Sequence, residues 1–501
     1  MKYDVIIGLE IHAEINTLSK MFCSCKNDPF YSQANFNICP ICLGHPGTLP
    51  LPNQEAIDKV LLLGLALDCQ INKISKFDRK NYFYPDLPKG YQISQFDLPL
   101  AYQGVLEINN QKIEITRIHL EEDTGKLNHP AGKNYTLIDF NRSGVPLLEL
   151  VTEPVIKDAI TARIFCQTFQ QILKYLEISS ANMEKGEMRC EANVSLQIKN
   201  SWRRTKDGKI VGLKNIKPNN KVELKNINSF KSLEKAISYE IKRQSKMLDR
   251  GEEILPETRG YNEKKGETFR QRVKESGADY RYFPEPDILP IKISSEQLKN
   301  LKNKIIELPH KKKARFIEEY GFSPDIADIL VDDKNLADWT EMALSELKEW
   351  LSSSGESWKN QRIKLSKLLA DYLISELFKF LKRDKVSIRD IKISPENFAQ
   401  LILLIHQEKI NSSSAQKILE IMYNTGGDPV VIMNDNNLEQ SQSDGKDLKE
   451  IISAIIKKYP DQFSEYQSGK DALLQFFIGK VMAETGGRFN PKKIIEIIKN
   501  L

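Results

Sequence analysis

Residues 3–15 read YDVIIGLEIHAEI, and from Gly8 onward polar and apolar side chains alternate in this segment. Side chains of a β-strand point alternately to the two faces of a sheet. Glu10, His12 and Glu14 therefore share one face of the strand, and the apolar residues between them share the other. The segment predicts a strand with one face on a hydrophobic core and with an opposite face that carries two carboxylates around an imidazole.

Residues 1–293 mix short runs typical of strands with longer helical stretches, and turn residues bound the runs. The strand-like runs are Tyr3–Ile11, Lys112–Leu120, Tyr135–Phe140 and Cys190–Ile198, and the helical stretches are Asn53–Leu67 and Asp158–Leu176. This mixture predicts an α+β fold with a large N-terminal domain built on a mixed or antiparallel sheet.

The pattern beyond Pro290 is almost wholly helical. Ser294, Ser323 and Ser394 are good N-caps at the starts of amphipathic segments, and the glycine-rich break at 426–429 ends the run. We expect three domains: 1–293, an all-α domain at 294–426 and a small all-α tail at 427–501.

The composition is that of a globular protein that is not anchored in a membrane. The chain has 501 residues, 40% of them hydrophobic, and a formal net charge of +5. This charge permits an anionic partner but does not require one. No apolar run approaches the ~20 residues that span a bilayer, and acidic residues interrupt the N-terminal apolar segment, which argues against a signal peptide. We expect a cytoplasmic location.

Four of the seven cysteines form two close pairs about a dozen residues apart. They are Cys23, Cys25, Cys39 and Cys42. Two tight thiolate pairs with such a spacing are typical of tetrahedral zinc sites, and four protein ligands leave no open position for catalysis. Redox-active thiols or coincidence are the alternatives. The spacing favours a structural zinc site that holds a loop beside the first strand.

Further carboxylates occur in two other strand-like segments. Glu149 lies inside the apolar run 146–151, where a buried carboxylate costs several kcal/mol unless a partner or a metal compensates it. Residues 118–126 add the doublet Glu121-Glu122. One shared divalent cation, with magnesium favoured by oxygen ligands, would satisfy Glu10, Glu122 and Glu149. Alternation by itself nominates Glu121 together with His119, so the choice between the two glutamates is open. The alternative to a metal site is an ordinary strand face that is solvated.

Cations, amides and aromatic rings gather in three other segments. The loop 78–95 is dense in such residues and suits a polar substrate or a stacked nucleotide, although a structural tyrosine corner would look similar. Its candidate ligand-binding residues are Lys80, Asn81, Tyr82 and Tyr84. Arg189 and Lys225 lie on two further strand-like runs, and such cations neutralise charge in phosphoryl transfer. The chain contains no Walker loop, kinase signature or dinucleotide fingerprint.

Taken together, these segments closely resemble the B subunits of tRNA-dependent amidotransferases. The resemblance extends over the whole chain. It rests on the segments 7–12, 77–85, 91–96, 119–126, 146–154, 223–230, 257–259 and 279–286, and on residues 479–482 and 487–491 of the tail.

The resemblance implies an ATP-dependent ligase that belongs to a heterotrimer. The amidase, which is the A chain of the complex, would release ammonia from glutamine, and a small C chain would join the two larger ones. The B chain would phosphorylate the side-chain carboxylate of Glu on tRNA(Gln) or of Asp on tRNA(Asn), and ammonia would then displace the phosphate. The first domain would be a cradle-shaped, kinase-like fold, and the helical regions would bind the tRNA.

Carried over by residue, the resemblance implies four magnesium ligands, Glu10, His12, Glu122 and Glu149, and four zinc cysteines, Cys23, Cys25, Cys39 and Cys42. Zinc occurs in only some family members, so the chemistry does not require it. Glu191 departs from the aspartate that is usual in the family. In the tail, the candidate phosphate contacts are Lys480, Arg488, Lys492 and Lys493, with a solvated lysine-rich helix face as the alternative. A non-catalytic tRNA-binding scaffold is the competing function.

Overall fold

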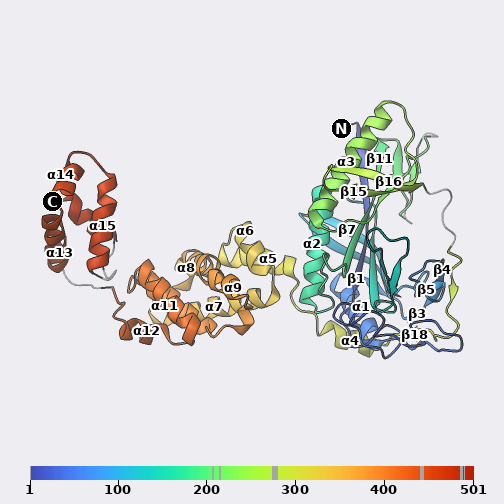
Figure 1. Cartoon of the computed structure of the whole chain (residues 1–501), viewed down its shortest axis with the longest axis horizontal. Coiled ribbons are helices and arrows are strands. Elements are labelled where there is room, and N and C mark those ends of the chain that lie inside the picture. Colours follow the sequence, from blue (N-terminus) through green and yellow to red (C-terminus); the bar gives the residue numbers. More distant parts are fainter. Residues whose placement is uncertain are drawn as a thin grey trace. The chain divides into compact units, whose positions relative to one another are not determined.

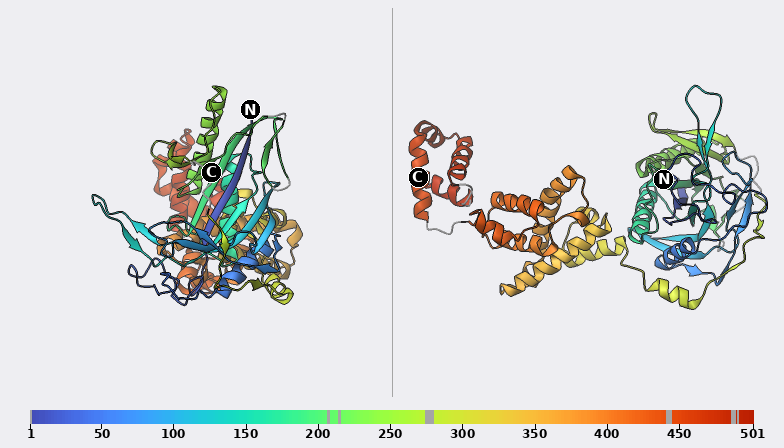
Figure 2. Two further views of the ribbon diagram at one scale, coloured as in Figure 1. Left: turned by 90° about the vertical axis from the view of Figure 1, so that its right-hand side faces the viewer. Right: turned by 60° about the horizontal axis from the view of Figure 1, so that its bottom comes forward.

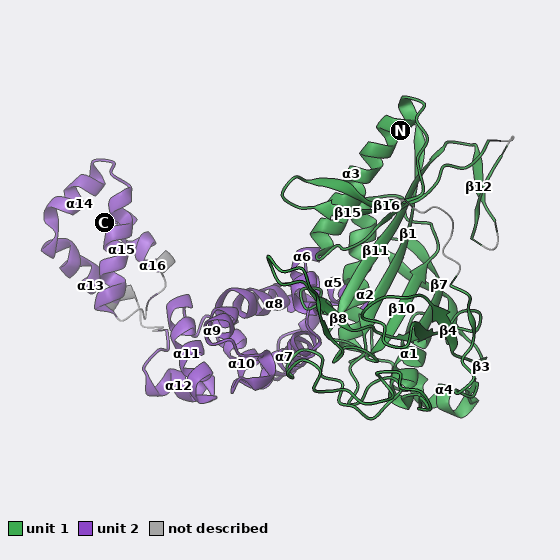
Figure 3. Ribbon diagram, turned by 45° about the vertical axis from the view of Figure 1, so that its right-hand side comes forward, with its two compact units in different colours: residues 1–308 green, residues 309–501 purple. Residues whose placement is uncertain are grey.

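The computed structural model describes the chain except for residue 1 and residues 206–207, 214–215, 274–279, 441–444, 486–488 and 490. The chain divides into two compact units, Met1–Leu308 and Pro309–Leu501, which are coloured separately in Figure 3.

The first unit is built on one large sheet, in which nine strands pair among the described residues. Their spatial order is β16 (Glu267–Val273), β15 (Glu257–Asn262), β14 (Val222–Leu224), β11 (Met188–Ile198), β1 (Tyr3–Glu14), β10 (Pro146–Thr152), β7 (Gln111–Glu122), β6 (Ala101–Ile108) and β2 (Gln70–Ile71). All neighbours pair antiparallel except β14 and β15, which are parallel. The sheet is thus mixed, as predicted, and β1 lies at its centre.

Helices cover one face of this sheet. They are α1 (Gln54–Ala66), α2 (Ala159–Tyr175) and α3 (Phe230–Asp249), and α4 (Ser295–Lys302) packs on α1. In Figure 1, α2 and α3 run along one side of the strands, and the turned views of Figure 2 show the strands side by side. Leu9, Ile11 and Ala13 are buried in the core beneath the helices. The alternation of β1 therefore directs the polar side chains to the opposite face.

One three-stranded sheet and three strand pairs accompany the large sheet among the described residues of the first unit. They are β17–β4–β5 (Phe283–Pro284, Asp78–Asn81 and Tyr91–Ser94), β18–β3 (Ile291–Lys292 and Ile74–Ser75), β8–β9 (Lys126–Asn128 and Leu137–Asp139) and β12–β13 (Trp202–Arg204 and Ile210–Gly212). In Figure 1, β4 and β5 lie on the other side of the large sheet from α2 and α3. The β4–β5 segment thus comes to the polar side of the sheet.

The second unit is helical throughout its described residues. Its helices are α5 (Pro309–Tyr320), α6 (Pro324–Val331), α7 (Lys334–Ser353), α8 (Trp358–Tyr372), α9 (Phe378–Asp384), α10 (Pro395–His406), α11 (Ser412–Thr425), α12 (Pro429–Asp435), α13 (Gly445–Lys458), α14 (Pro460–Gln467), α15 (Ala472–Glu484) and α16 (Pro491–Lys499), with a π-turn at Leu373–Leu377 and a 3-10 turn at Ile388–Asp390. Residues 316–438 and 448–498 bury two separate hydrophobic cores. None of the described helices combines the length and hydrophobicity needed to span a membrane.

Most of the predicted elements are present, and the N-caps act as expected. The hydroxyls of Ser294, Ser323 and Ser394 each accept a hydrogen bond from a backbone N–H three residues ahead. The helix after Ser294 packs in the first unit through Leu301, so this unit ends at Leu308. The division of the chain into three domains stays a prediction.

Candidate active site

The register of four strands aligns a polar row across the centre of the large sheet. His12 on β1 lies opposite Arg189 on β11 and opposite Glu149 on β10. Glu149 in turn lies opposite His119 on β7. Because directly opposed residues of antiparallel strands share a face, all four side chains project from the face that the helices leave uncovered.

The carboxylates and imidazoles of this row are in close contact. Nε2 of His12 lies 3.3 Å from Oε2 of Glu149 and 4.0 Å from Oε1 of Glu10. Nε2 of His119 lies 3.4 Å from the same oxygen of Glu149. The potential ligand atoms of Glu10, His12 and Glu149 all lie within 4.8 Å of one another. A divalent cation could therefore bind between two carboxylates and one imidazole, as a set of mainly oxygen donors allows.

The charged groups of the row shift one another's pKa values. Burial alone would lower the pKa of His12, but the hydrogen bond and charge of Glu149 raise it to about 9. Burial likewise opposes ionisation of Glu149, yet His119 and His12 hold the pKa of this carboxyl well below its usual range. Burial and the neighbouring Glu149 raise the pKa of Glu10. Such divergent shifts are typical of functional clusters.

The two glutamates of the doublet face different surroundings. Oε1 of Glu121 lies 3.5 Å from Nε2 of His12, so this carboxylate belongs to the row. Glu122 instead accepts hydrogen bonds from Nζ of Lys89 at 2.6 Å and from the backbone N–H of Ile93 at 2.9 Å. The structure therefore brings three of the four predicted magnesium ligands together, and it adds Glu121 in place of Glu122.

Arg189, at one end of the row, and Lys225, beside it, are both engaged in ion pairs. Arg189 binds Asp123 with an N–O distance of 2.8 Å, and Nζ of Lys225 lies 2.7 Å from Oε2 of Glu191. The charge of Asp123 raises the pKa of the Arg189 guanidinium. Glu191, Glu223 and Glu10 form a second group of acids around Lys225.

The four predicted ligand-binding residues of the loop 78–95 differ in their contacts with the site. Lys80 on β4 lies 5.1 Å from the ring centre of Tyr280. Burial opposes the charge of Lys80, yet Glu121 and Glu149 raise its pKa. The hydroxyl of Tyr82 donates to Gln92, and the side chain of Asn81 donates to the carbonyl of Arg281. Tyr84 is exposed. Of these four residues, Lys80 is thus the one whose charge interacts with the acids of the row.

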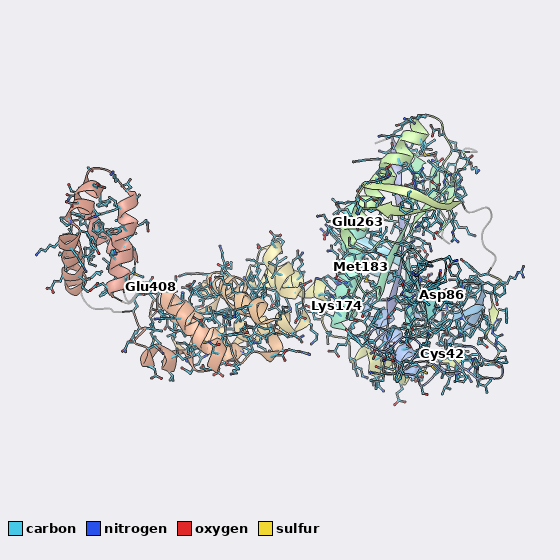
Figure 4. All side chains as sticks on the ribbon, viewed as in Figure 1. Cys42, Asp86, Lys174, Met183, Glu263 and Glu408 are labelled. Carbon is cyan, nitrogen blue, oxygen red and sulfur yellow. The ribbon has the colours of Figure 1, made fainter. Side chains whose placement is uncertain are left out.

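The four clustered cysteines meet as predicted. One sulfur from each of them lies within 4.8 Å of the others. Tetrahedral zinc with Zn–S bonds of about 2.3 Å places its sulfurs about 3.8 Å apart, which is compatible with this grouping. A hydrogen bond from Cys23 and the charge of Lys20 lower the pKa of Cys42 to about 5. The cluster lies in the segment where Cys42 is labelled in Figure 4.

The cysteine loop also forms one wall of a cavity of about 190 Å³. Cys42 and His45 lie on this wall, and Arg79, Lys89 and Glu122 contribute to the lining. The hydroxyl of Ser143 donates to the carbonyl of Cys42, and Gly144 follows at the cavity lining. The loop is thereby fixed to the segment that precedes β10.

The predicted tRNA contacts of the tail lie partly outside the described residues. Lys480 on α15 stacks over the rings of Tyr459 and Phe476 at 5.3 and 5.4 Å. Lys493 on α16 is exposed. Arg488 lies outside the described residues, and Lys492 lies in α16 with a side chain that is not described.

Arg117 could have been found from the alternation of β7, which already nominates His119 and Glu121. Arg117, His119 and Glu121 occupy every second position, which places them on one face. Arg117 did not enter the prediction because it stands outside the acidic block. Its NH2 group lies 3.6 Å from Oε1 of Glu149.

Comparisons with known proteins agree with this geometry. The family described as "GatB/GatE catalytic domain" matches residues 5–299, and the family described as "GatB domain" matches residues 356–501. The chain is 39% identical to the B subunit of the aspartyl/glutamyl-tRNA(Asn/Gln) amidotransferase of Persephonella marina, over 100% of both chains. It is 41% identical to the protein of the same name from Thermosipho melanesiensis, over 100% of this chain and 99% of the relative. The row of acids and imidazoles lies entirely within the part matched as catalytic, and the chain belongs to the GatB family.

Proposed function

We propose that this chain is the B subunit of an aspartyl/glutamyl-tRNA(Asn/Gln) amidotransferase and that it contains the ligase site of the complex. The observation that carries the proposal is the group of possible metal ligands Glu10, His12 and Glu149 on the open face of the sheet. The cations Lys80 and Arg117 lie near this group. Buried carboxylates that converge on imidazoles are costly without a function or a counter-charge. Phosphoryl transfer needs this combination of metal ligands and cations.

The proposed reaction has two steps. The side-chain carboxylate of Glu or Asp on the tRNA attacks the γ-phosphorus of ATP, and the bond to the β,γ-bridging oxygen breaks with release of ADP. Ammonia then attacks the acyl carbon of the acyl phosphate. The bond from that carbon to the phosphate oxygen breaks, inorganic phosphate leaves, and the nitrogen loses a proton as the amide forms.

We propose a magnesium site formed by Glu10, His12 and Glu149, with Glu121 as the neighbouring carboxylate. When bound, the cation would neutralise charge on the phosphate oxygens. The assignment of Glu122 remains a prediction, and the pairing of its carboxylate with Lys89 favours Glu121. Arg189 and Lys225 would keep the acids beside the row in place, and Lys80 would contact the nucleotide.

The four cysteines are proposed to hold a structural zinc ion. Cys39 and Cys42 are three residues apart, and the N–H of Cys39 donates to Sγ of Cys42 at 3.1 Å, as in tight thiolate turns. The ion would fix the loop that forms one wall of the cavity.

The partners follow from the same proposal. The amidase of the complex would supply ammonia, a small third chain would complete a heterotrimer, and the complex would act in the cytoplasm. The helical domain and the tail would bind the tRNA, with Lys480 and Lys493 as described candidates for phosphate contacts and Arg488 and Lys492 as further ones.

The test is the reconstituted complex of the three chains with Glu-tRNA(Gln) and Asp-tRNA(Asn). We expect ATP cleavage that depends on the misacylated tRNA, and replacement of His12 by Ala should abolish it while glutamine hydrolysis continues. ATP cleavage that persists in this variant would favour the competing scaffold function. Assays of the two tRNAs also identify the substrate.

A further inference from the structure

Most of the cations near the acidic row are held by short ion pairs. Asp123 is 3% exposed and binds Arg189 at 2.8 Å, and Lys225 is 2.7 Å from Glu191. Removal of Arg189 would leave the buried carboxylate of Asp123 with one ion pair among the described residues, the longer contact to Arg142 at 3.7 Å. Removal of Lys225 would take away the cation that Glu191 binds. These two cations are therefore poorly placed to bind a substrate anion.

Arg117 makes weaker ionic contacts than Arg189 and Lys225 do. Its one ion pair within the described part of the chain is to Glu149, at 3.6 Å, and its Nε has no hydrogen-bond partner there. Glu149 keeps His12 and His119 as partners when Arg117 turns away. The side chain of Arg117 is 36% exposed, so a ligand can reach it.

Lys80 on β4 is the second available cation near the row. Glu121 and Glu149 act on its charge, and it makes no ion pair within 4 Å among the described residues. Burial raises the pKa of Tyr282, whereas the positive charges of Lys80 and Arg117 lower it. Nζ of Lys80 lies 5.1 Å from the ring centre of Tyr280, and the ring centre of Tyr280 lies 6.1 Å from that of Tyr282. Lys80 on β4 and Arg117 on β7 thus act on the same tyrosine from different strands.

We infer that Arg117, together with Lys80, forms the subsite that binds the phosphoryl group during its transfer. This inference rests on the proposed function. The planar guanidinium can donate two parallel hydrogen bonds to a phosphate, whereas the ammonium acts as a point charge. The unpaired Nε and the weak contact to Glu149 mean that binding a phosphate breaks no strong interaction.

The subsite is tested by isotope exchange in the reconstituted complex. ATP labelled with ¹⁸O at the β,γ-bridge scrambles its label when the phosphoryl group moves reversibly to Glu-tRNA or Asp-tRNA in the absence of glutamine. We expect Arg117→Ala to slow this exchange roughly 100-fold, the loss typical of one oxyanion donor, and Arg117→Lys to recover part of it. Glutamine hydrolysis by the amidase should not change.

Arg204→Ala is the matched control, because Arg204 has a similar exposure of 30% and an ion pair to Glu114 but lies on β12. It should exchange like the wild type. Thermal unfolding separates loss of the fold from loss of the subsite, and Arg117→Lys provides the second variant. Wild-type exchange rates in both Arg117 variants would overturn the inference, and so would a raised KM for the tRNA alone with normal exchange at saturation. If the wild-type complex does not cleave ATP in the presence of the misacylated tRNA, the proposed function fails and this inference fails with it.

Discussion

His12 on β1 and Glu149 on β10 lie directly opposite each other, with Nε2 and Oε2 3.3 Å apart, although 137 residues separate them in sequence. The contact depends on register, because a slip of either strand by one residue would turn the side chain of that strand toward the hydrophobic core. The apolar face of β1 is buried beneath the helices, and this burial fixes the register. The fold thus positions the site through the same alternation that builds its core.

The glutamate doublet allows a test of the metal ligands. We predict that Glu121→Gln weakens the affinity for Mn²⁺, a spectroscopic substitute for magnesium, about 10-fold or more, because Glu121 lies beside His12. Glu122→Gln should have a smaller direct effect, since its carboxylate binds Lys89 and Ile93. Titration of Mn²⁺ by electron paramagnetic resonance measures both. A larger loss of Mn²⁺ affinity in Glu122→Gln than in Glu121→Gln would show that Glu122 is the metal ligand.

The cysteine cluster predicts a zinc content of one ion per chain. Cys42→Ser should lose the ion, whereas Cys69→Ser, which removes a buried thiol outside the cluster, should keep it. Because thiolate ligation contributes folding free energy, Cys42→Ser should also increase proteolysis within residues 23–48. Atomic emission analysis of the purified chain gives the zinc content. Equal zinc content in the two variants would contradict the assignment.

A buried ion network that joins α3 to β15 and β16 predicts a pH-dependent stability. Glu257 is 2% exposed and accepts hydrogen bonds from Arg259 and Arg270. Burial would raise its pKa, but these arginines lower it below the ordinary value of 4.5. A lowered native-state pKa stabilises the fold above about pH 4.5, and this contribution disappears as the pH falls through the native pKa.

We therefore expect Glu257→Gln to lower the free energy of unfolding by about 3 kcal/mol at pH 7, the cost of breaking a buried pair. The difference from the wild type should shrink below about pH 4. Glu252→Gln, on an exposed pair with Arg250, should change little. Thermal unfolding followed by circular dichroism at about pH 7 and about pH 3.5 measures both variants, and a loss that does not depend on pH would refute the role of the charge.

Strand alternation and cysteine spacing were sufficient to predict β1, the sulfur cluster and the helical second half of the chain. The helix α3 was missed, and the strand-like run that was expected to include Lys225 ends at Leu224 in the structure. Glu240 and Gln244 interrupt the apolar stripe of this helix although both are fully buried. Glu240 is compensated by Arg243 and Arg259, a tertiary arrangement that periodicity does not reveal.

The choice between Glu121 and Glu122 depended on the direction of their side chains, because both residues lie within β7. Alternation correctly placed Glu121 on the face of His119 and His12, whereas the family resemblance pointed to Glu122. The hydrogen bonds of Glu122 come from Lys89 and Ile93, and these partners lie far from it in sequence. A single sequence therefore identifies the acids of a site more readily than their partners.

The central claim is that the row around His12 and Glu149 transfers a phosphoryl group. The most direct measurement is the scrambling of ¹⁸O from the β,γ-bridge of ATP by the reconstituted complex of Glu149→Gln, in the presence of Glu-tRNA or Asp-tRNA and without glutamine. Our account predicts that the exchange falls at least ~100-fold while glutamine hydrolysis by the amidase is retained. Exchange at the wild-type rate would show that the phosphoryl group moves elsewhere.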